Sequence, residues 1–433
     1  MEEEELKKLI VFAFSLLLLL VGCTKETTAP NLESGQAEHT LKKVAFIKKP
    51  KDANFLNCDL YLINMDGSKE TLVDKDIVAF FNNDSTNQPV PIKWSPDGNK
   101  LVYLKNNNII IFDINTKIKM TIPSIQFNLS KDNAFSFLVS WSPDSKKIAY
   151  LKDLPSSDNT KNANFEIYVK DLSSDIDQRL TYSDYKWFSS VFPTWSPDGN
   201  KIAYYEYGSS PSINTIKIDG SDLHKNPLSQ TKVDGEMVWS KNGSGLYYYS
   251  VNSWNYIFYL NLSSGTESAY KIEKNEFCEM NQTFQLYKQY DKTNNLLVYP
   301  YILESYTPYF KRGKTEYDFR IAYLKTAVIN ENTENSSVAI TPDNDKGLTY
   351  YAIQPCFSGD YKTVVFSMHK EDTNKIKSLL ENMSDHDLKS INQINDELVN
   401  FDIYSVSVTG QNLKKITDGT LDNSLNLLPV VQP

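Results

Sequence analysis

Four aspartates recur at the same place in a repeated segment of this 433-residue chain. Carboxylates contributed by several segments could together bind a metal ion or act as general acids and bases. Each aspartate, however, follows Ser-Pro or Ser-Gly, which is the composition of a tight turn. An aspartate in such a turn accepts hydrogen bonds from its own backbone, so turn formation alone accounts for the residue. We therefore assign a structural role to Asp97, Asp144, Asp198 and Asp360.

Other residues that commonly act in catalysis form no recognised motif. The four histidines each fall in a predicted linker, hairpin or insertion: His39, His224, His369 and His386. The chain has no Gly-x-Ser-x-Gly nucleophile elbow, and no group of cysteines and histidines has the spacing of a metal site. The sequence therefore predicts no catalytic residues, no metal and no other cofactor.

The aspartates belong to a ten-residue repeat with a period of about fifty residues. Its clearest copies are residues 94–103, 141–150 and 195–204, and weaker copies follow at 239–248, 290–299 and 357–366. In each copy an aromatic residue ends one strand, a tight turn follows, and a second strand begins. Four short strands per repeat are typical of a β-propeller blade. The tryptophans at its first position are expected to pack between blades: Trp94, Trp141, Trp195 and Trp239.

A seventh copy is split between the two ends of the chain. Residues 41–46 resemble the second half of the repeat, and Pro429–Pro433 aligns with the first half at Pro193–Pro197. Pairing of these two ends would close the ring and remove a free sheet edge. The sequence therefore predicts an all-β fold over residues 41–433: a seven-bladed β-propeller closed by pairing of its N- and C-terminal strands.

The string Trp-Ser-Pro-Asp-Gly-x-Lys-Ile-Ala-Tyr resembles the repeat of the TolB-type β-propellers, which also occurs in propeller domains of prolyl oligopeptidase relatives. The resemblance covers residues 41–433 and implies the propeller fold. It also implies protein–protein interaction in the cell envelope. The chain departs from TolB itself, which carries an N-terminal α/β domain, a signal peptide without lipidation and six blades.

The first residues indicate export. Lys7 and Lys8 precede an apolar run, residues 9–20, whose length suits a signal peptide. The run ends in Leu-Val-Gly-Cys23, which resembles the bacterial lipobox and implies cleavage before Cys23 and acylation of that cysteine. An ordinary signal peptide with a coincidental cysteine is the alternative. Residues 1–22 are thus predicted to be a lipoprotein signal peptide, and residues 23–40 a flexible tether.

Net charge and cysteine content limit which partners and disulfide bridges the chain can have. The net charge of −9 argues against a nucleic-acid partner, which requires a basic surface. Besides Cys23 there are three cysteines, Cys58, Cys278 and Cys356, and an odd number on different blades is not a disulfide framework. A bridge between Cys58 and Cys356 on neighbouring blades is one hypothesis, and isolated thiols are the other.

Long connections interrupt the repeat on one side. By the strand register, residues 153–164, 302–318 and 370–400 each join the second strand of a blade to the third, so all three open on the same face. Such insertions often mark a binding face. Residues 370–400 have apolar positions at helical spacing, which predicts a small helical hairpin in blade seven. That hairpin would either pack on the propeller or form a docking surface.

Aromatic residues gather on connections predicted for the same face, and exposed aromatics are common in recognition surfaces. They are Tyr182, Tyr185, Trp187, Phe188, Trp254, Tyr306, Tyr309 and Phe310. The sequence thus favours a monomeric, non-enzymatic lipoprotein of the cell envelope that binds a protein or glycan partner through this face. One alternative is a propeller enzyme or glycan-processing protein with its site in the central channel. Another is a sensor ectodomain that acts with a partner.

Overall fold

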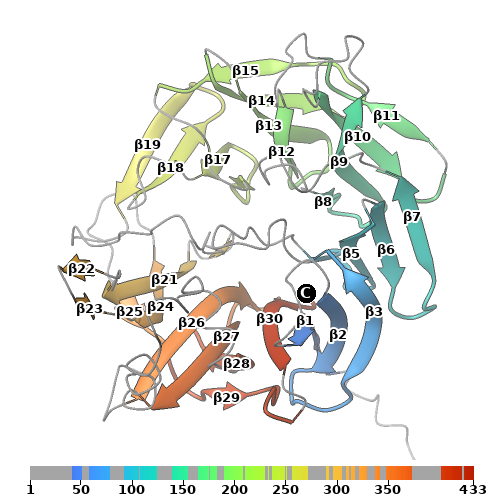
Figure 1. Cartoon of the computed structure of the whole chain (residues 1–433). Coiled ribbons are helices and arrows are strands. Elements are labelled where there is room, and N and C mark those ends of the chain that lie inside the picture. Colours follow the sequence, from blue (N-terminus) through green and yellow to red (C-terminus); the bar gives the residue numbers. More distant parts are fainter. Residues whose placement is uncertain are drawn as a thin grey trace, which may run out of the picture. The chain divides into compact units, whose positions relative to one another are not determined.

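The described part of the chain consists of β-strands and connections and contains no helix. The computed structural model divides the chain into two units, residues 1–41 and residues 42–433. Strands β1 to β30 all belong to the second unit (Figure 1). The structure describes residues 41–433 except for 51–57, 79–91, 107, 124–138, 155–163, 175, 183–189, 208–209, 230–232, 234–236, 249, 251–255, 272–288, 292–295, 305–308, 312–313, 317–320, 329–336, 342–347, 373–400 and 422–423.

Five sheets of four antiparallel strands form blades 1 to 5, and Figure 1 shows their last strands on the outside. From the innermost strand outward, blade 1 consists of β30 (Ser424–Val431), β1 (Lys43–Pro50), β2 (Cys58–Asn64) and β3 (Thr71–Ile77). In the same order, blade 2 consists of β4 (Lys93–Trp94), β5 (Lys100–Lys105), β6 (Asn108–Asp113) and β7 (Lys119–Pro123), and blade 3 of β8 (Ser140–Trp141), β9 (Lys147–Leu154), β10 (Asn164–Asp171) and β11 (Asp177–Arg179). Blade 4 consists of β12 (Ser190–Trp195), β13 (Lys201–Glu206), β14 (Ser212–Lys217) and β15 (His224–Pro227), and blade 5 of β16 (Val238–Trp239), β17 (Gly245–Tyr248), β18 (Tyr256–Asn261) and β19 (Thr266–Lys271).

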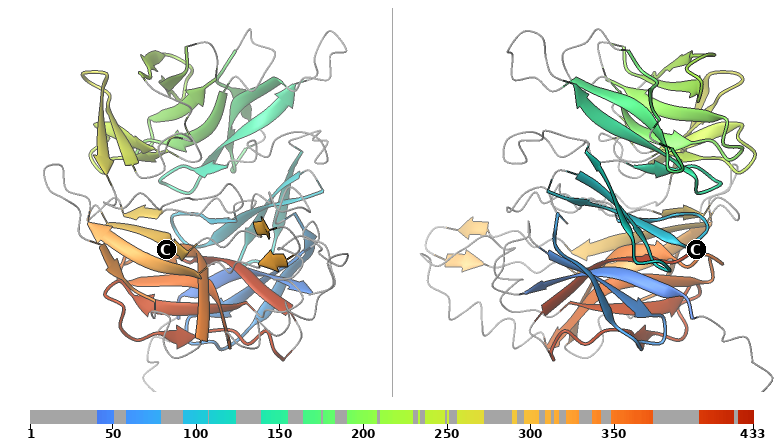
Figure 2. Two further views of the ribbon diagram at one scale, coloured as in Figure 1. Left: turned by 60° about the vertical axis from the view of Figure 1, so that its left-hand side comes forward. Right: turned by 90° about the vertical axis from the view of Figure 1, so that its right-hand side faces the viewer.

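A sixth blade contains eight strands. They are β20 (Gln289–Asp291), β21 (Leu296–Glu304), β24 (Ile321–Val328), β25 (Ser337–Ala339), β26 (Leu348–Phe357), β27 (Thr363–Asp372), β28 (Asp402–Ser407) and β29 (Lys414–Lys415). A separate hairpin, β22 (Tyr309–Lys311) and β23 (Lys314–Glu316), projects away from this sheet (Figure 2).

The prediction of seven blades was wrong, because the described residues form six. The copies of the repeat at residues 290–299 and 357–366 share one sheet, in which β24 and β26 pair in parallel through Ala322 and Tyr351. Strand β26 has ten residues, more than the innermost strands of blades 1 to 5, which have between two and eight. The longer strand reaches the neighbouring copy and joins its sheet.

The helical insertion predicted for residues 370–400 is also not found in the described part of the chain. Lys370 to Asp372 belong to strand β27, and residues 373–400 lie outside the described residues. The apolar spacing that suggested a helix lies entirely in that stretch.

The core lies between blades, and the strand sequences reflect this position. Strand β5 (KLVYLK) is buried at its four central residues, because neighbouring blades cover both of its faces. The outer strand β7 (KMTIP) is buried only at Ile122. A typical hydrophobic cluster joins Ile47 and Leu60 of blade 1 to Leu101 and Tyr103 of blade 2. Each blade therefore depends on its neighbours for burial of its apolar side chains.

Three of the four repeat tryptophans link consecutive blades through their indole N–H groups. Trp195 donates to the carbonyl of Ser140 in the preceding blade at 3.0 Å, and Trp239 donates to the carbonyl of Thr194 at 3.1 Å. Trp94 donates to the carbonyl of Val430 on β30 at 3.0 Å. The buried Nε1 of Trp141 has no acceptor among the described residues.

The two ends of the described chain pair with each other in blade 1. Strand β1 is antiparallel to β30, with Val44 opposite Val431. Beyond β30, the Gln432 amide donates to the carbonyl of Gly98 in the turn of blade 2 at 2.8 Å. The chain terminus thus occupies the place of a repeat turn and contacts the next blade as the other turns do.

No disulfide joins Cys58 to Cys356. Both cysteines are buried, but Cys58 lies in the hydrophobic cluster shared by blades 1 and 2, and Cys356 lies in the cluster shared by blade 1 and the sixth blade. Cys58 and Cys356 are therefore separate thiols, as the second hypothesis states. Cys278 lies outside the described residues.

An ionic cluster crosses the boundary between blades 1 and 2. Asp74 on β3 contacts Lys105 Nζ at 2.7 Å and Lys119 Nζ at 2.8 Å, and it accepts a hydrogen bond from the Tyr103 hydroxyl at 2.6 Å. Burial raises the pKa of Asp74, but the hydrogen bonds from Lys105, Lys119 and Tyr103 outweigh it and lower the pKa to about 2. The cluster therefore stabilises the ionised carboxylate.

Replacing Trp195 with Phe should destabilise the protein more than replacing Trp141 with Phe. Both changes remove the same volume from a buried site, but only Trp195 loses an inter-blade hydrogen bond, worth about 1 kcal/mol. Urea unfolding of the two variants measures the difference in the free energy of unfolding. Equal losses would show that the indole hydrogen bond contributes nothing to the contact between blades.

The Asp74→Asn variant should lose about 2 kcal/mol of unfolding free energy at pH 7. Because the folded-state pKa of Asp74 is about 2 and the unfolded value is 3.8, its contribution is present above pH 3.8 and is lost as the pH falls toward 2. The gap between wild type and variant should therefore shrink to about half by pH 3. Unfolding curves at both pH values check this, and a gap that is constant with pH would contradict it.

Candidate functional site

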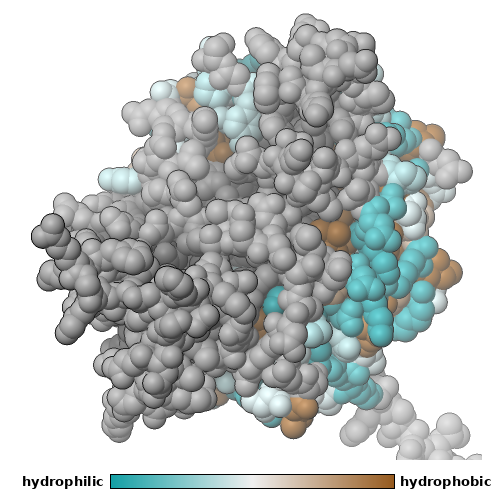
Figure 3. Space-filling view, viewed as in Figure 1, coloured by the Kyte–Doolittle hydropathy of each residue, from teal (hydrophilic) through white to brown (hydrophobic). Residues whose placement is uncertain are grey.

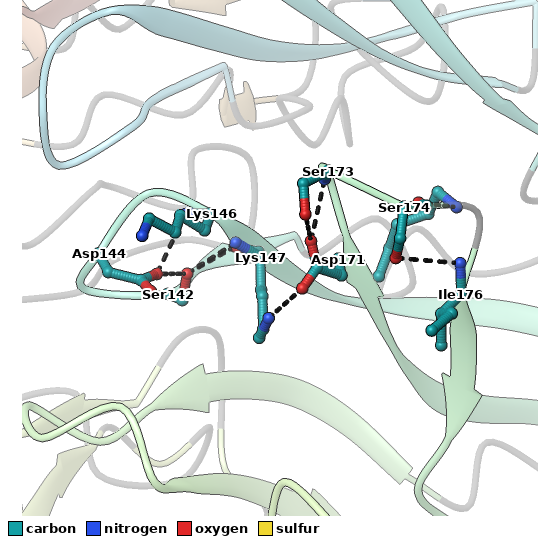
Figure 4. Close-up of polar contacts among 9 residues, drawn as sticks. Ser142, Asp144, Lys146, Lys147, Asp171, Ser173, Ser174 and Ile176 are labelled. Atoms are coloured by element: carbon teal, nitrogen blue, oxygen red, sulfur yellow. Dashed lines mark hydrogen bonds and ion pairs between the residues drawn. The ribbon is translucent and has the colours of Figure 1, made fainter.

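The repeated aspartates bond to their own turns. In Figure 4 the Ser142 hydroxyl donates to Asp144 Oδ1 at 2.6 Å, and the backbone N–H of Lys146 donates to the same oxygen at 3.0 Å. Asp97, Asp198 and Asp360 accept the corresponding hydrogen bonds.

These bonds also set the charge of the turn carboxylates. The serine hydroxyl bond is the main cause that lowers the pKa of Asp144, Asp198 and Asp360. At Asp97, burial raises the pKa, but the hydrogen bonds from Ser95 and Asn99 outweigh it and lower the pKa. All four side chains are therefore ionised acceptors that hold the turn.

A groove of about 440 Å³ lies between strand β7 of blade 2 and the outer part of blade 3. Its lining includes Lys152, Lys170 and Asp177. Lys152 and Asp177 form an ion pair at 3.2 Å, and Lys170 donates to the carbonyl of Ser174, which Figure 4 shows beside Ser173. The charged groups that line this groove thus form their ion pair and hydrogen bond within blade 3.

Of the eight aromatics predicted for a binding face, Tyr182 is the one whose side chain the structure describes. It is 75% exposed and directly precedes a stretch outside the described residues. Tyr309 and Phe310 lie on β22, opposite Glu316 and Thr315 of β23, where the backbone alone is described. The remaining five lie outside the described residues: Tyr185, Trp187, Phe188, Trp254 and Tyr306.

Tyr182 is supported by an arginine that pairs with a buried carboxylate. The guanidinium of Arg179 lies 4.3 Å from the centroid of the Tyr182 ring, within the range of a cation–π contact. The same guanidinium contacts Glu166 at 3.2 Å, and Arg179 Nε donates to the carbonyl of Thr181 at 2.7 Å. Glu166 is fully buried and also accepts a hydrogen bond from the Thr181 hydroxyl. We call Glu166, Arg179, Thr181 and Tyr182 the tyrosine platform.

The platform can present a fixed aromatic surface. A buried carboxylate is costly unless it is paired, so Glu166 holds the Arg179 guanidinium close. The guanidinium in turn covers one face of the Tyr182 ring, while most of the side chain stays in solvent. Rigid, exposed tyrosines bind partners with a small loss of side-chain entropy, and they are enriched at binding hot spots.

The platform lies at the end of blade 3 where the insertions open. The backbone N–H of Leu180 donates to the carbonyl of Ile167, and the N–H of Ile167 donates to the Thr181 hydroxyl. Both bonds involve Ile167, in the first half of β10, and the chain from Leu180 to Tyr182 runs toward the start of that strand, which follows residues 155–163. We call this end of the blades the insertion face.

Sequence reasoning missed Glu166 and Arg179. A second copy of their arrangement occurs on the sixth blade, where Lys415 contacts Asp402 at 2.9 Å and the Thr417 hydroxyl accepts from the N–H of Ile403. The shared signal is Arg-Leu-Thr at residues 179–181 and Lys-Ile-Thr at residues 415–417. The residue after the threonine is Tyr182 in one copy and Asp418 in the other, so the aromatic is particular to blade 3.

Neither a metal-binding cluster nor a membrane-spanning helix is found among the residues that the structure describes. Among them, no group of three or more histidine, cysteine, aspartate or glutamate side chains is placed to hold a metal ion. None of the described segments forms a helix that is long and apolar enough to cross a membrane. A site in the central channel stays a prediction, because the side chains of β20 and most of those of β26 are not described.

Comparison of the sequence with protein-family models finds no match, and no curated protein matches it. The structure is similar to many solved structures. Puromycin hydrolase (an S511A mutant complexed with PGG) is 11% identical with a TM-score of 0.54; the match covers 87% of this chain and 53% of the hydrolase. This chain thus spans about half the length of that protein.

Two further structures are similar over most of the chain. TolB from Acinetobacter baumannii is 14% identical with a TM-score of 0.41, covering 90% of this chain and 67% of TolB. An oligogalacturonate lyase from Vibrio parahaemolyticus is 13% identical with a TM-score of 0.47, covering 76% of this chain and 91% of the lyase. At these identities the likeness concerns the fold alone. The chain is a β-propeller, and TolB propellers are among its structural neighbours.

Proposed function

We propose that this chain is a cell-envelope lipoprotein whose propeller binds a protein or glycan partner through the insertion face. The observation that carries the proposal is the tyrosine platform, in which a 75% exposed Tyr182 is held by Arg179 on the buried Glu166. A flexible tyrosine on a loop would lose side-chain entropy on binding, whereas this ring is already oriented. The propeller supplies the rigid scaffold for it.

The surroundings of the platform support a recognition role. Tyr182 leads directly into residues 183–189, which contain Tyr185, Trp187 and Phe188. The long connection at residues 155–163 opens at the same end of blade 3. Aromatic anchors beside variable connections on a rigid β-scaffold are a common arrangement of binding surfaces.

The membrane anchor is proposed from the sequence. The lipobox-like Leu-Val-Gly-Cys23 and the apolar run before it support acylation of Cys23, and residues 23–40 have the composition of a flexible linker. In this proposal the acyl chains hold the protein at the membrane, and the propeller meets its partner in the envelope.

Replacing Tyr182 with Ala should weaken partner binding at least about tenfold, since removal of a hot-spot aromatic commonly costs 2 kcal/mol or more. Crosslinking and pull-down from the native envelope would reveal a protein partner, and sedimentation with isolated envelope polysaccharide would reveal a glycan. Leu72→Ala is the control, because Leu72 is 44% exposed on the outer strand β3 of blade 1 and belongs to neither face. Equal binding by both variants and wild type would rule out the platform as the binding site.

Radiolabelled palmitate should be incorporated into the wild-type chain in its native host and should be lost in the Cys23→Ala variant. The reason is that Cys23 is the residue at which the lipobox-like sequence directs acylation. Label that persists in Cys23→Ala would place the modification elsewhere and would overturn the proposed anchor.

A further inference from the structure

Four aliphatic side chains are exposed at one equivalent position of the repeat. Each directly precedes the outer strand of its blade: Ile118 before β7, Ile176 before β11, Leu223 before β15 and Leu413 before β29. Their exposed fractions are 66%, 68%, 47% and 37%. On the side of Figure 3 where Figure 1 places β6 and β7, hydrophobic patches lie among hydrophilic residues.

Turn geometry does not require an aliphatic residue at this position. In several blades the preceding residue has a positive φ, for example 63° at Lys117 and 59° at Asn412. Blades 1 and 5 have the same feature at Lys69 and Gly265 but continue with Glu70 and Thr266. Polar residues therefore suit the hairpin equally well. An exposed apolar side chain in isolation is ordinary, but its recurrence at one position indicates a surface with a common use.

These hairpins all open on the face opposite the insertion face. Because successive strands of a blade are antiparallel, the hairpin between the third and fourth strands lies at the same end as the repeat turn. The insertions, and with them Tyr182, lie at the other end of the strands. We call the end that carries the repeat turns and the outer hairpins the turn face.

The preceding part of the chain joins the propeller at the turn face. Strand β1 is the second strand of blade 1, so its first residue lies at that end. The carbonyl of Lys42, just before β1, accepts a hydrogen bond from the N–H of Met65 in the β2–β3 hairpin at 2.9 Å. Residues 23–40, which the proposed function treats as a lipid-anchored tether, therefore connect to this face.

Lysines flank the exposed aliphatics. Lys117 and Lys119 border Ile118, and Lys414 follows Leu413. Lys119 Nζ is held by Asp74, and Lys414 Nζ donates to the carbonyl of Asp66. The exposed Lys117 is therefore the lysine best placed to extend toward lipid phosphates while Ile118 enters the interface. The hairpin aspartate Asp219 accepts hydrogen bonds from Ser221, so its carboxylate is engaged within its own turn.

We infer that the turn face docks on the surface of the lipid bilayer that holds the anchor, with Ile118, Ile176, Leu223 and Leu413 entering the interface. The inference rests on the proposed lipid anchor. A tether of 18 residues (23–40) spans about 20–25 Å, so the turn face is held within reach of the bilayer at high effective concentration. A few aliphatic side chains then suffice for docking, and the insertion face with Tyr182 is directed away from the membrane.

Hydroxyl-radical footprinting with mass spectrometry tests the docking. The full acylated chain is placed in vesicles of phosphatidylethanolamine with a minority of phosphatidylglycerol. It is compared with the mature chain, residues 23–433 with Cys23→Ala, in solution. Oxidation of the four aliphatic residues should fall at least about threefold in vesicles, because the interface excludes them from water. Oxidation of Tyr182 and Leu421, which belong to the insertion face, should stay unchanged. Unchanged oxidation of the four, or equal protection of both faces, would overturn the inference.

A second measurement separates docking from anchoring. The mature chain, residues 23–433 with Cys23→Ala, is floated with the same vesicles, with and without serine at the four aliphatic positions. The serine variant should bind at least about fivefold less, because it lacks the apolar side chains that enter the interface. A control with Tyr182→Ser and Leu421→Ser should bind like the parent. Absence of palmitate label from the wild-type chain would refute the anchor, whereas equal flotation of parent and serine variant would refute docking even where acylation is present.

Discussion

Burial between neighbouring blades is the interaction on which the rest of this structure depends. A single blade has middle strands that are apolar on both faces, so it cannot bury them alone. Clusters such as the one that joins Leu101 and Tyr103 to Ile47 supply the missing cover. The same requirement applies at the two ends of the chain, which is why β30 and β1 pair and Gln432 bonds to the next blade. Polar contacts, including the Asp74 cluster and the indole bonds, then fix how adjacent blades are aligned.

This requirement explains why the residues with the greatest catalytic potential are structural. The turn aspartates accept hydrogen bonds that keep the turn short, and a short turn allows the next blade to approach closely. Pro197 of one turn, for example, lies 3.9 Å from the position that a side chain at Gly243 of the next turn would occupy. Repetition of a chemically reactive residue around a ring therefore indicates repeated packing geometry. Residues that occur in one blade only, such as Tyr182, are better indicators of function.

The repeat allowed much of the fold to be predicted, because its period and turn chemistry are local properties. It located the strands of blades 2 to 5 and matched Pro429–Pro433 to a missing first strand. It did not predict that the copies at residues 290–299 and 357–366 share a sheet, since that depends on how far β26 extends and on one pairing with β24.

In the candidate site, Tyr182 was found by residue type. Glu166 and Arg179 were not, because their contact depends on the pairing of β10 with β11, which sets Arg179 opposite Tyr168 and diagonal to Glu166.

The two ends of the blades are built under different constraints, and this difference is the basis for proposing different partners for them. Connections at the turn face are short, and side-chain hydrogen bonds such as those of Asp144 and Asp219 hold them. Side chains there are therefore presented at regular, separated positions, which suits a fluid surface that has no fixed shape. Connections at the insertion face differ in length and sequence from blade to blade, so they can form one shaped surface around Tyr182. A partner with a defined structure is accordingly expected at the insertion face, and a bilayer at the turn face.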